Sequence, residues 1–330
     1  MKHGTVRSPE RGLPFIRLQG CGHADCLCWR LAKCSICLIV IWLTLACAAP
    51  CYSEEAPIFI RTIGSEGGAD GHLSNAHGLG VAPSGNIFVA NSGNRRIEVF
   101  GASGQFLYNA NGAGSETGSF GGPIDVSVAS GDTVYVSDGG NLDVFGPAFQ
   151  YLRHWTGPLG CIALDPSGRL LYSTIGTYVY VYRISDGVLI HFWRCANRSP
   201  GQQVGLGIGP SGTIYVPGDG YVQKFSPDGV FLGHWQPPSG AIGSLTVDDQ
   251  ENVYVLSGSV DGDLLSKCSS DGTLLFSTLV GDNGSVDIAL DQAHGYVYVL
   301  TQGGSQVRQF GYASVPTARR TWGALKALYR

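Results

Sequence analysis

The sequence has few charged residues and few segments that could form an amphipathic helix. Charged side chains make up 14% of its 330 residues, and clusters of Gly, Ser and Asp recur between short apolar runs, with 49 glycines in all. Short strands separated by such turns favour an all-β domain over a helical one. The hydrophobic fraction of 44% is ample for a core and excludes wholesale disorder.

The chain also lacks the short motifs of several enzyme classes and any basic patch. A nucleophile elbow, a P-loop and a dinucleotide-binding fingerprint are all missing. Without residues 1–51, 15 basic and 23 acidic residues remain, a net charge near −8, and four of those bases lie in the last dozen residues. The body is therefore close to −12 and repels phosphate, which argues against nucleic acid as a partner.

The first 51 residues differ in composition from the rest. They hold seven of the ten cysteines and an apolar run over residues 34–49. This run has the length of a signal peptide's hydrophobic region and is shorter than the roughly 20 apolar residues of a membrane span. We therefore expect residues 1–51 to be a leader with a signal peptide, and the protein to be secreted or located in the cell envelope. The alternative is a retained signal-anchor, with the protein held to a membrane by residues 34–49.

A turn followed by an alternating strand recurs six times in the rest of the chain. The first copy, GNIFVANSGNRRIEVF at residues 85–100, has two alternating apolar runs around a Gly/Asn turn, which is typical of a β-hairpin. The copies are marked by the aligned aromatic residues Phe88, Tyr135, Tyr172, Tyr215, Tyr254 and Tyr298. Their mean spacing of 42 residues leaves room for four short strands in each unit.

Four antiparallel strands per repeat predict a β-propeller blade. In the first unit the pattern predicts strands over residues 79–82, 87–90, 97–100 and 105–109. The last unit lacks its fourth strand, whereas residues 57–64 form a spare strand at the start, and pairing the two removes an open edge. We therefore expect an all-β fold over residues 52–312: a six-bladed β-propeller of four-stranded blades, its ring closed by an N-terminal strand.

The first repeat resembles the NHL family of propellers. The resemblance is carried by GNIFVANSGNRRIEVF and by IGSEGGADGHLSNAHGLGV at residues 63–81, which is similar to the segment between NHL blades. It covers residues 57–311 and is weaker in the later blades, where Asn94 and Arg96 have no clear counterparts. A propeller implies a scaffold and not one activity. The family resemblance also implies that some such propellers are amidating lyases, with a metal held by histidines around the central channel.

Histidine placement bears on that lyase alternative. Metal ligands must converge at about 2.0–2.1 Å, so they should occupy equivalent positions on different blades. His77 lies just before the innermost strand of the first blade. Its counterparts are not histidines, namely Ile124, Gly160, Val204, Gly243 and Val286. His154 and His234 lie in outer strands, each followed by Trp, which indicates a packing role. His77 is therefore a candidate for ligand binding or for a hydrogen bond to its linker.

Three further groups are candidate binding residues. Asp125, at the start of a channel-facing strand, could contact a ligand or calcium, or be a solvated carboxylate. Arg96 could bind an anion, or hold its own hairpin through hydrogen bonds to Asn91 or a neighbouring carboxylate. Asp261 and Asp263 have oxygen donors for calcium but lack the spacing of a full calcium loop. We therefore expect no cofactor, with calcium as the one ion left open.

The last 18 residues form a separate basic segment. Residues 313–330 contain Arg319, Arg320, Lys326 and Arg330. Thr321 can cap a short helix that follows it. The apolar face of that helix would consist of Trp322, Leu325, Leu328 and Tyr329. This tail is expected to dock on the propeller or to act as a membrane-surface or sorting segment.

These patterns together predict a non-catalytic binding or scaffold propeller that acts outside the cytoplasm. Loops at the channel mouth would hold a peptide, a glycan or a protein, because variable loops on a rigid scaffold are where such sites occur. A membrane would be met only through the N-terminal segment or the C-terminal tail. Two alternatives stay open: a divergent metal-dependent, lyase-like enzyme, and a structural cell-envelope protein anchored by its N-terminal segment.

Overall fold

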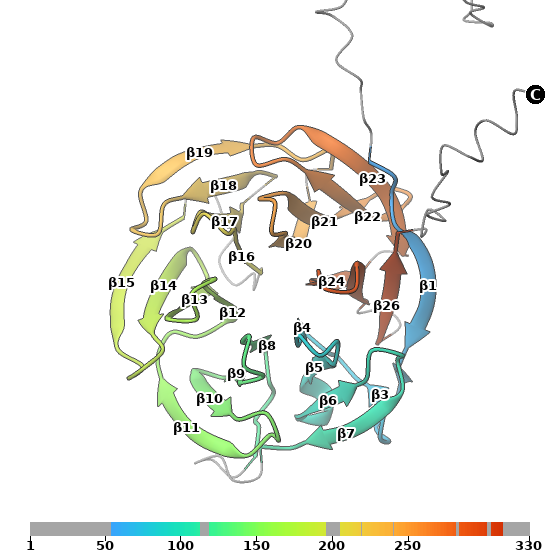
Figure 1. Cartoon of the computed structure of the whole chain (residues 1–330), viewed down its shortest axis with the longest axis vertical. Coiled ribbons are helices and arrows are strands. Elements are labelled where there is room, and N and C mark those ends of the chain that lie inside the picture. The colour runs from blue at the N-terminus through green and yellow to red at the C-terminus, as the bar shows by residue number, and fades with distance from the viewer. Residues whose placement is uncertain are drawn as a thin grey trace, which may run out of the picture. The chain divides into compact units, whose positions relative to one another are not determined.

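The computed structural model describes residues 54–112, 119–195, 205–218, 220–239, 241–281, 284–301 and 305–312. The predicted leader (1–51) and tail (313–330) lie outside these residues. Within the described part, six four-stranded antiparallel sheets form blades around a central channel (Figure 1), which confirms the predicted six-bladed β-propeller. The helical content of this part is one 3₁₀ turn, η1 (Ser92–Asn94). None of it is a helix long and apolar enough to cross a membrane.

Each blade is built from strands that follow one another along the chain, starting at the channel and ending at the outer rim. The first three blades consist of β4 (Gly78–Val81), β5 (Ile87–Asn91), β6 (Arg96–Phe100) and β7 (Phe106–Ala110); β8 (Asp125–Val128), β9 (Val134–Asp138), β10 (Asn141–Phe145) and β11 (Tyr151–Thr156); and β12 (Cys161–Leu164), β13 (Leu170–Ile175), β14 (Tyr178–Arg183) and β15 (Leu189–Arg194). The strands of blade 1 match the predicted ranges to within one residue at each end.

The remaining blades repeat this order until the ring closes. They consist of β16 (Gly207–Ile208), β17 (Ile214–Pro217), β18 (Val222–Phe225) and β19 (Phe231–Trp235); β20 (Ala241–Val247), β21 (Val253–Ser259), β22 (Gly262–Cys268) and β23 (Leu274–Gly281); and β24 (Ser285–Asp291), β25 (Tyr296–Thr301) and β26 (Gln306–Gly311), with β1 (Ile58–Ile63) as the outermost strand. A short parallel pair, β2 (Ser65–Glu66) and β3 (His72–Leu73), lies in the segment between β1 and blade 1.

The ring is closed by the N-terminal strand, as predicted. β1 runs antiparallel to β26, with Ile58 opposite Gly311 and Ile63 opposite Val307. Ile63 is 1% exposed and packs with Leu73 and Val307 in one hydrophobic cluster that contains residues of both blade 6 and blade 1. The first and last described strands, β1 and β26, therefore lie in the same blade. In that blade β26 is paired on both sides, with β25 and with β1.

A small residue on the innermost strand lies opposite each of the six marker aromatics. The pairs are Gly80–Phe88, Ser127–Tyr135, Ala163–Tyr172, Gly207–Tyr215, Thr246–Tyr254 and Ala289–Tyr298. Small residues occupy these positions because there is little space near the channel axis. A Cβ at Gly80 would lie 2.7 Å from the Val126 carbonyl oxygen, and a Cβ at Gly207 would lie 2.6 Å from a methyl of Val247. Bulky side chains therefore occupy the second strand, where the blades are farther apart.

Tryptophans on the outer strands join neighbouring blades. Trp155, Trp193 and Trp235 each cover a turn glycine of the next blade, and a Cβ on those glycines, Gly187, Gly229 and Gly272, would lie 2.6–2.7 Å from the indole ring. The same glycines have positive φ angles, which favour glycine. Trp155 and Trp235 are the residues that follow His154 and His234, so in each predicted His-Trp pair the tryptophan packs against the next blade.

Ring closure predicts different costs for two isoleucines of β1. Ile63→Ala should lower the free energy of unfolding by about 2–4 kcal/mol, because it empties a buried site between blades 6 and 1. Ile58→Ala, at a position that is 58% exposed, should change it by less than about 0.5 kcal/mol. Chemical denaturation followed by tryptophan fluorescence measures both. Equal effects of the two substitutions would contradict the closed ring.

Candidate functional site

Six equivalent positions form a ring at the start of the innermost strands. Strand register defines them, since each lies the same number of residues before the turn that ends its strand. They are occupied by Gly78, Asp125, Cys161, Gly205, Ser244 and Asp287. Each is one residue after His77 or one of its counterparts. Two carboxylates, from blades 2 and 6, therefore enter one narrow end of the channel.

Asp125 joins blade 2 to blade 3. Its Oδ1 accepts a hydrogen bond from the backbone N–H of Val126 at 2.7 Å, and its Oδ2 accepts one from the N–H of Ile162 at 2.7 Å. Only 7% of Asp125 is exposed. The predicted channel-facing position is therefore confirmed, whereas the alternative of a solvated carboxylate does not fit this burial.

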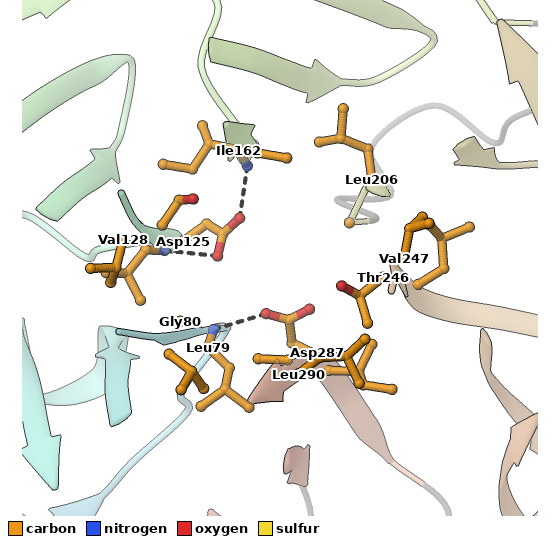
Figure 2. Close-up of a pocket in the computed structure, with 18 of the residues that line it drawn as sticks. Leu79, Gly80, Asp125, Val128, Ile162, Leu206, Thr246, Val247, Asp287 and Leu290 are labelled. Atoms are coloured by element: carbon orange, nitrogen blue, oxygen red, sulfur yellow. Dashed lines mark hydrogen bonds between the residues drawn. The ribbon is translucent and has the colours of Figure 1, made fainter. Parts of the chain in front are cut away.

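Asp287 makes the corresponding contacts from blade 6 to both of its neighbours. Its Oδ2 accepts a hydrogen bond from the N–H of Leu79 in blade 1 at 2.8 Å. Its Oδ1 accepts one from the hydroxyl of Ser244 in blade 5, also at 2.8 Å. Figure 2 shows the two carboxylates close to one another in the channel, reaching it from blades 2 and 6, which lie on either side of blade 1. Two acidic side chains thus connect five of the six blades.

Glycines in the same ring make room for these side chains. A Cβ at Gly78 would lie 2.4 Å from Oδ1 of Asp125. A Cβ at Gly205 would lie 2.4 Å from the Ser244 hydroxyl and 3.6 Å from Oδ1 of Asp287. An alanine at either position would therefore displace the acidic pair or a side chain that holds it. Glycine at these two positions of the ring is therefore a packing requirement of the site.

The carboxylates border a cavity of about 180 Å³ (Figure 2). Most of the described residues that line it are apolar, and no Lys, Arg or His is among them. Burial raises the pKa of Asp125 well above its usual range, and the neighbouring Asp287 charge raises it further, against the effect of the two backbone hydrogen bonds. Burial also raises the pKa of Asp287 to about 6, although its own hydrogen bonds lower it. The cavity therefore holds two carboxyl groups whose ionised forms are neutralised by no described lining side chain.

His77 lies at the same end of the channel as Asp125. Its neighbour Gly78 borders Asp125, and its backbone N–H donates to the carbonyl of Ala90 at 3.0 Å. Its Nε2 is buried and has no hydrogen-bond partner among the described residues. Burial lowers the pKa of His77, which keeps the ring neutral near pH 7. His77 is not among the described residues that line the acidic cavity, so of the predicted site residues only Asp125 borders it.

Arg96 lies elsewhere, in the hairpin between β5 and β6. Its guanidinium pairs with Glu98, which is fully buried, and donates to the carbonyl of Ala69 at 2.6 Å. Glu98 also accepts a hydrogen bond from the N–H of Gly71 at 3.3 Å. Asn91 takes part by accepting from the N–H of Ser74 at 2.8 Å. Arg96 and its partners hold the segment between β1 and blade 1 against the hairpin, as the neighbouring-carboxylate alternative predicted.

The two calcium candidates in blade 5 differ in environment. Asp261 is exposed in the turn between β21 and β22, whereas Asp263 is 5% exposed and accepts a hydrogen bond from the N–H of Ser285 at 2.6 Å. Across the described ranges, no three His, Cys, Asp or Glu side chains gather closely enough to hold a metal ion. Asp263 therefore contributes to the contact between blades 5 and 6.

Asp287 was not among the residues predicted from the sequence. The signal was present, because Val286 was aligned with His77 and Ile124, and the residue after Ile124 is Asp125. Extending that alignment by one position places Asp287 at the position of blade 6 that corresponds to Asp125 in blade 2. Its contact with Leu79, 208 residues away, depends on ring closure and has no counterpart in local sequence.

In comparisons of the whole sequence with protein-family profiles and with curated proteins, no match was found. The fold is therefore established by the structure, and the NHL resemblance of the first repeat stays a resemblance.

The raised pKa of Asp287 predicts a pH-dependent effect of Asp287→Asn. The native state holds a proton on Asp287 between about pH 4 and pH 6 that the unfolded chain releases, so this group lowers stability as pH rises through that window. Asn cannot ionise. The free energy of unfolding of the variant should equal that of the natural protein at pH 4 and exceed it by about 1–3 kcal/mol at pH 7. Denaturation curves at both pH values measure the difference, and a variant that is less stable at pH 7 would contradict it.

Asp125→Asn is the matched comparison. An Asn at 287 can accept from the N–H of Leu79 and donate to the hydroxyl of Ser244, which also accepts. An Asn at 125 faces two N–H donors, so its amide nitrogen loses one hydrogen bond. Asp125→Asn should therefore be less stable than Asp287→Asn at pH 7.

Proposed function

We propose that this protein is a non-catalytic binding propeller of the NHL type, and that it acts outside the cytoplasm. Its ligand is a peptide or protein segment that inserts a basic side chain into the channel mouth. The loops around the mouth, on the blade ends next to Asp125 and Asp287, bind the rest of the ligand. The extracellular placement rests on the signal-peptide pattern of residues 1–51.

The proposal is carried by one observation: two buried carboxylates face one cavity, and none of the described residues lining it is a cation. Burying ionised carboxylates is costly unless a positive partner compensates them. An ammonium or guanidinium group from a ligand would supply that charge and would lower both pKa values. Unlike a surface acid, this pair loses little attraction to screening by salt, because it is largely removed from solvent.

The size and rigidity of the site support binding over chemistry. A cavity of about 180 Å³ is comparable to one long amino-acid side chain, which favours a peptide over a glycan. Both oxygens of Asp125 and both of Asp287 already accept hydrogen bonds from fixed donors of the propeller. The carboxylates are thus held in place by the scaffold, which preorganises them for a cation at little entropic cost.

Short capped peptides that differ only at a central Lys, Arg, Gln or Glu test the proposal. Titration calorimetry at pH 7 should detect binding of the Lys or Arg peptide and none of the Gln or Glu peptide. Asp287→Asn should weaken that binding about tenfold or more, the equivalent of one lost charge contact. Asp271→Asn, which removes an exposed acid in a turn of blade 5, should leave it unchanged.

Several results would overturn the proposal. Equal binding of the Gln and Lys peptides would remove the charge argument, as would unchanged affinity in Asp287→Asn. Mass spectrometry of the recovered peptide should show the starting mass, and a cleaved or modified product would indicate an enzyme. Calcium is titrated alone as a second probe. Tight calcium binding without any peptide binding would show that the ligand of the cavity is a metal ion and not a peptide.

A further inference from the structure

The outer rim of blades 3 and 4 exposes a patch of large apolar side chains. We define the blade 3–4 rim as Leu189, Ile190 and Phe192 of β15, Val230 in the turn before β19, and Phe231 and Leu232 of β19. Each of these six is between 41% and 61% exposed. The outer strands β1 and β11, by contrast, carry Arg61 and Arg153 between their apolar residues. No acidic residue lies within β15 or β19.

The patch is continuous across the two blades. β15 and β19 follow one another along the edge of the ring (Figure 1). The ring nitrogen Nε2 of His191 in β15 donates to the carbonyl of Asp228, two residues before Val230, at 2.9 Å. Trp193 packs against Phe225 with ring centroids 5.8 Å apart. These contacts fix the two rim strands relative to one another, so that they present one surface.

The area of this patch suits an interface between two proteins. The six rim residues expose roughly 600 Å² per copy, so a pair of copies would bury about 1,200 Å², the lower end of stable interfaces. β15 is also an edge strand, and its outward N–H and C=O groups are free to pair with another strand. Natural proteins commonly protect such edges with charges, and β15 has a single one, Arg194 at its end.

Opposite charges at the two ends of β15 favour a second copy as the partner. Arg194 is exposed and forms no ion pair with another described residue. Asp186 lies in the turn that precedes the other end of β15, where it pairs with Arg183 at 3.1 Å while its side chain stays 45% exposed. Antiparallel pairing of β15 with the same strand of a second copy brings the Arg194 end of each copy toward the Asp186 end of the other. A two-fold axis repeats this attraction, as expected for a self-complementary interface.

We propose that two copies of this protein associate through antiparallel pairing of β15 at the blade 3–4 rim. The apolar rim residues are buried between the copies, and Arg194 of each copy faces Asp186 of the other. The channel mouths stay open in this arrangement, because β15 is the outermost strand of its blade. The proposal does not depend on which ligand the channel takes.

A charge-exchange experiment tests the pairing. Arg194→Asp places two acids at each contact of a dimer beside Arg183, and Asp186→Arg places three arginines there, Arg183 included. Each variant alone should dissociate at least tenfold more readily than the natural protein. In an equimolar mixture of the two variants, every contact is again between opposite charges, and heterodimers should form with near-natural affinity. Sedimentation velocity over a concentration series, with one variant fluorescently labelled, measures the dimer dissociation constants of each variant alone and of the mixture.

Controls separate the interface from folding and from other parts of the chain. Arg95→Asp makes the same charge change at an exposed turn of blade 1, away from blades 3 and 4, and should leave dimerisation unchanged. Phe192→Lys places a charge within the patch and should abolish it. Near-ultraviolet circular dichroism and the unfolding midpoint of each variant should match the natural protein. The full chain and residues 52–330 are both measured, because residues 34–49 are apolar enough to associate by themselves.

The outcomes against the proposal are distinct. A natural protein that is monomeric at every concentration would overturn it. So would dimers that survive both single variants, or variants that fail to restore each other in the mixture. Association of the full chain but not of residues 52–330 would assign the contact to the leader. Binding of residues 52–330 to anionic lipid vesicles through Phe192, without dimers, would make the rim a membrane contact.

Discussion

Six strands meet at one narrow axis, and the lack of space there determines much of the rest of the structure. At the axis a Cβ on Gly80 or Gly207 would collide with a neighbouring strand, so the innermost strands carry small residues at the positions opposite the marker aromatics. The large aromatics opposite them, such as Phe88 and Tyr215, move one strand outward and fill the gaps between blades. Because the axis is crowded, few positions near it can hold a polar side chain, and those that do contact the next blade.

The acidic pair follows from this crowding. Asp125 and Asp287 reach backbone N–H groups of adjacent blades, so they contribute to the packing of the ring. Their burial also raises both pKa values, which means that the ionised pair opposes folding near neutral pH. A site that is destabilised in its empty state is commonly one whose geometry serves binding. The propeller supplies the stability for it through the blade-to-blade contacts of Trp155, Trp193 and Trp235.

The sequence predicted the parts of the structure that repeat and missed those that depend on pairing across the ring. The aromatic spacing gave the number of blades, and residues 57–64 indicated how the ring closes, because both patterns lie within short stretches. His77 and Asp125 were placed at the channel mouth by their position before or at the first strand of a blade. Asp287 was missed because its importance comes from Leu79, on the far side of the ring closure. The partner of Arg96 was likewise left open between Asn91 and a neighbouring carboxylate, since only the folded linker shows that Glu98 holds both Arg96 and Gly71.

Closure of the ring and formation of the acidic cavity both depend on the contact between blades 1 and 6. The hydrogen bond from Leu79 to Asp287 crosses from blade 1 to blade 6, the same two blades that Ile63 of β1 joins at the rim. Before β1 pairs with β26, nothing covalent fixes blade 6 next to blade 1, because the two are separated by four other blades in the chain. Asp287 can therefore reach its partner only in the closed ring. The acidic cavity thus depends on the longest-range contacts of the fold, and a ligand that binds it stabilises the closed ring over any open form.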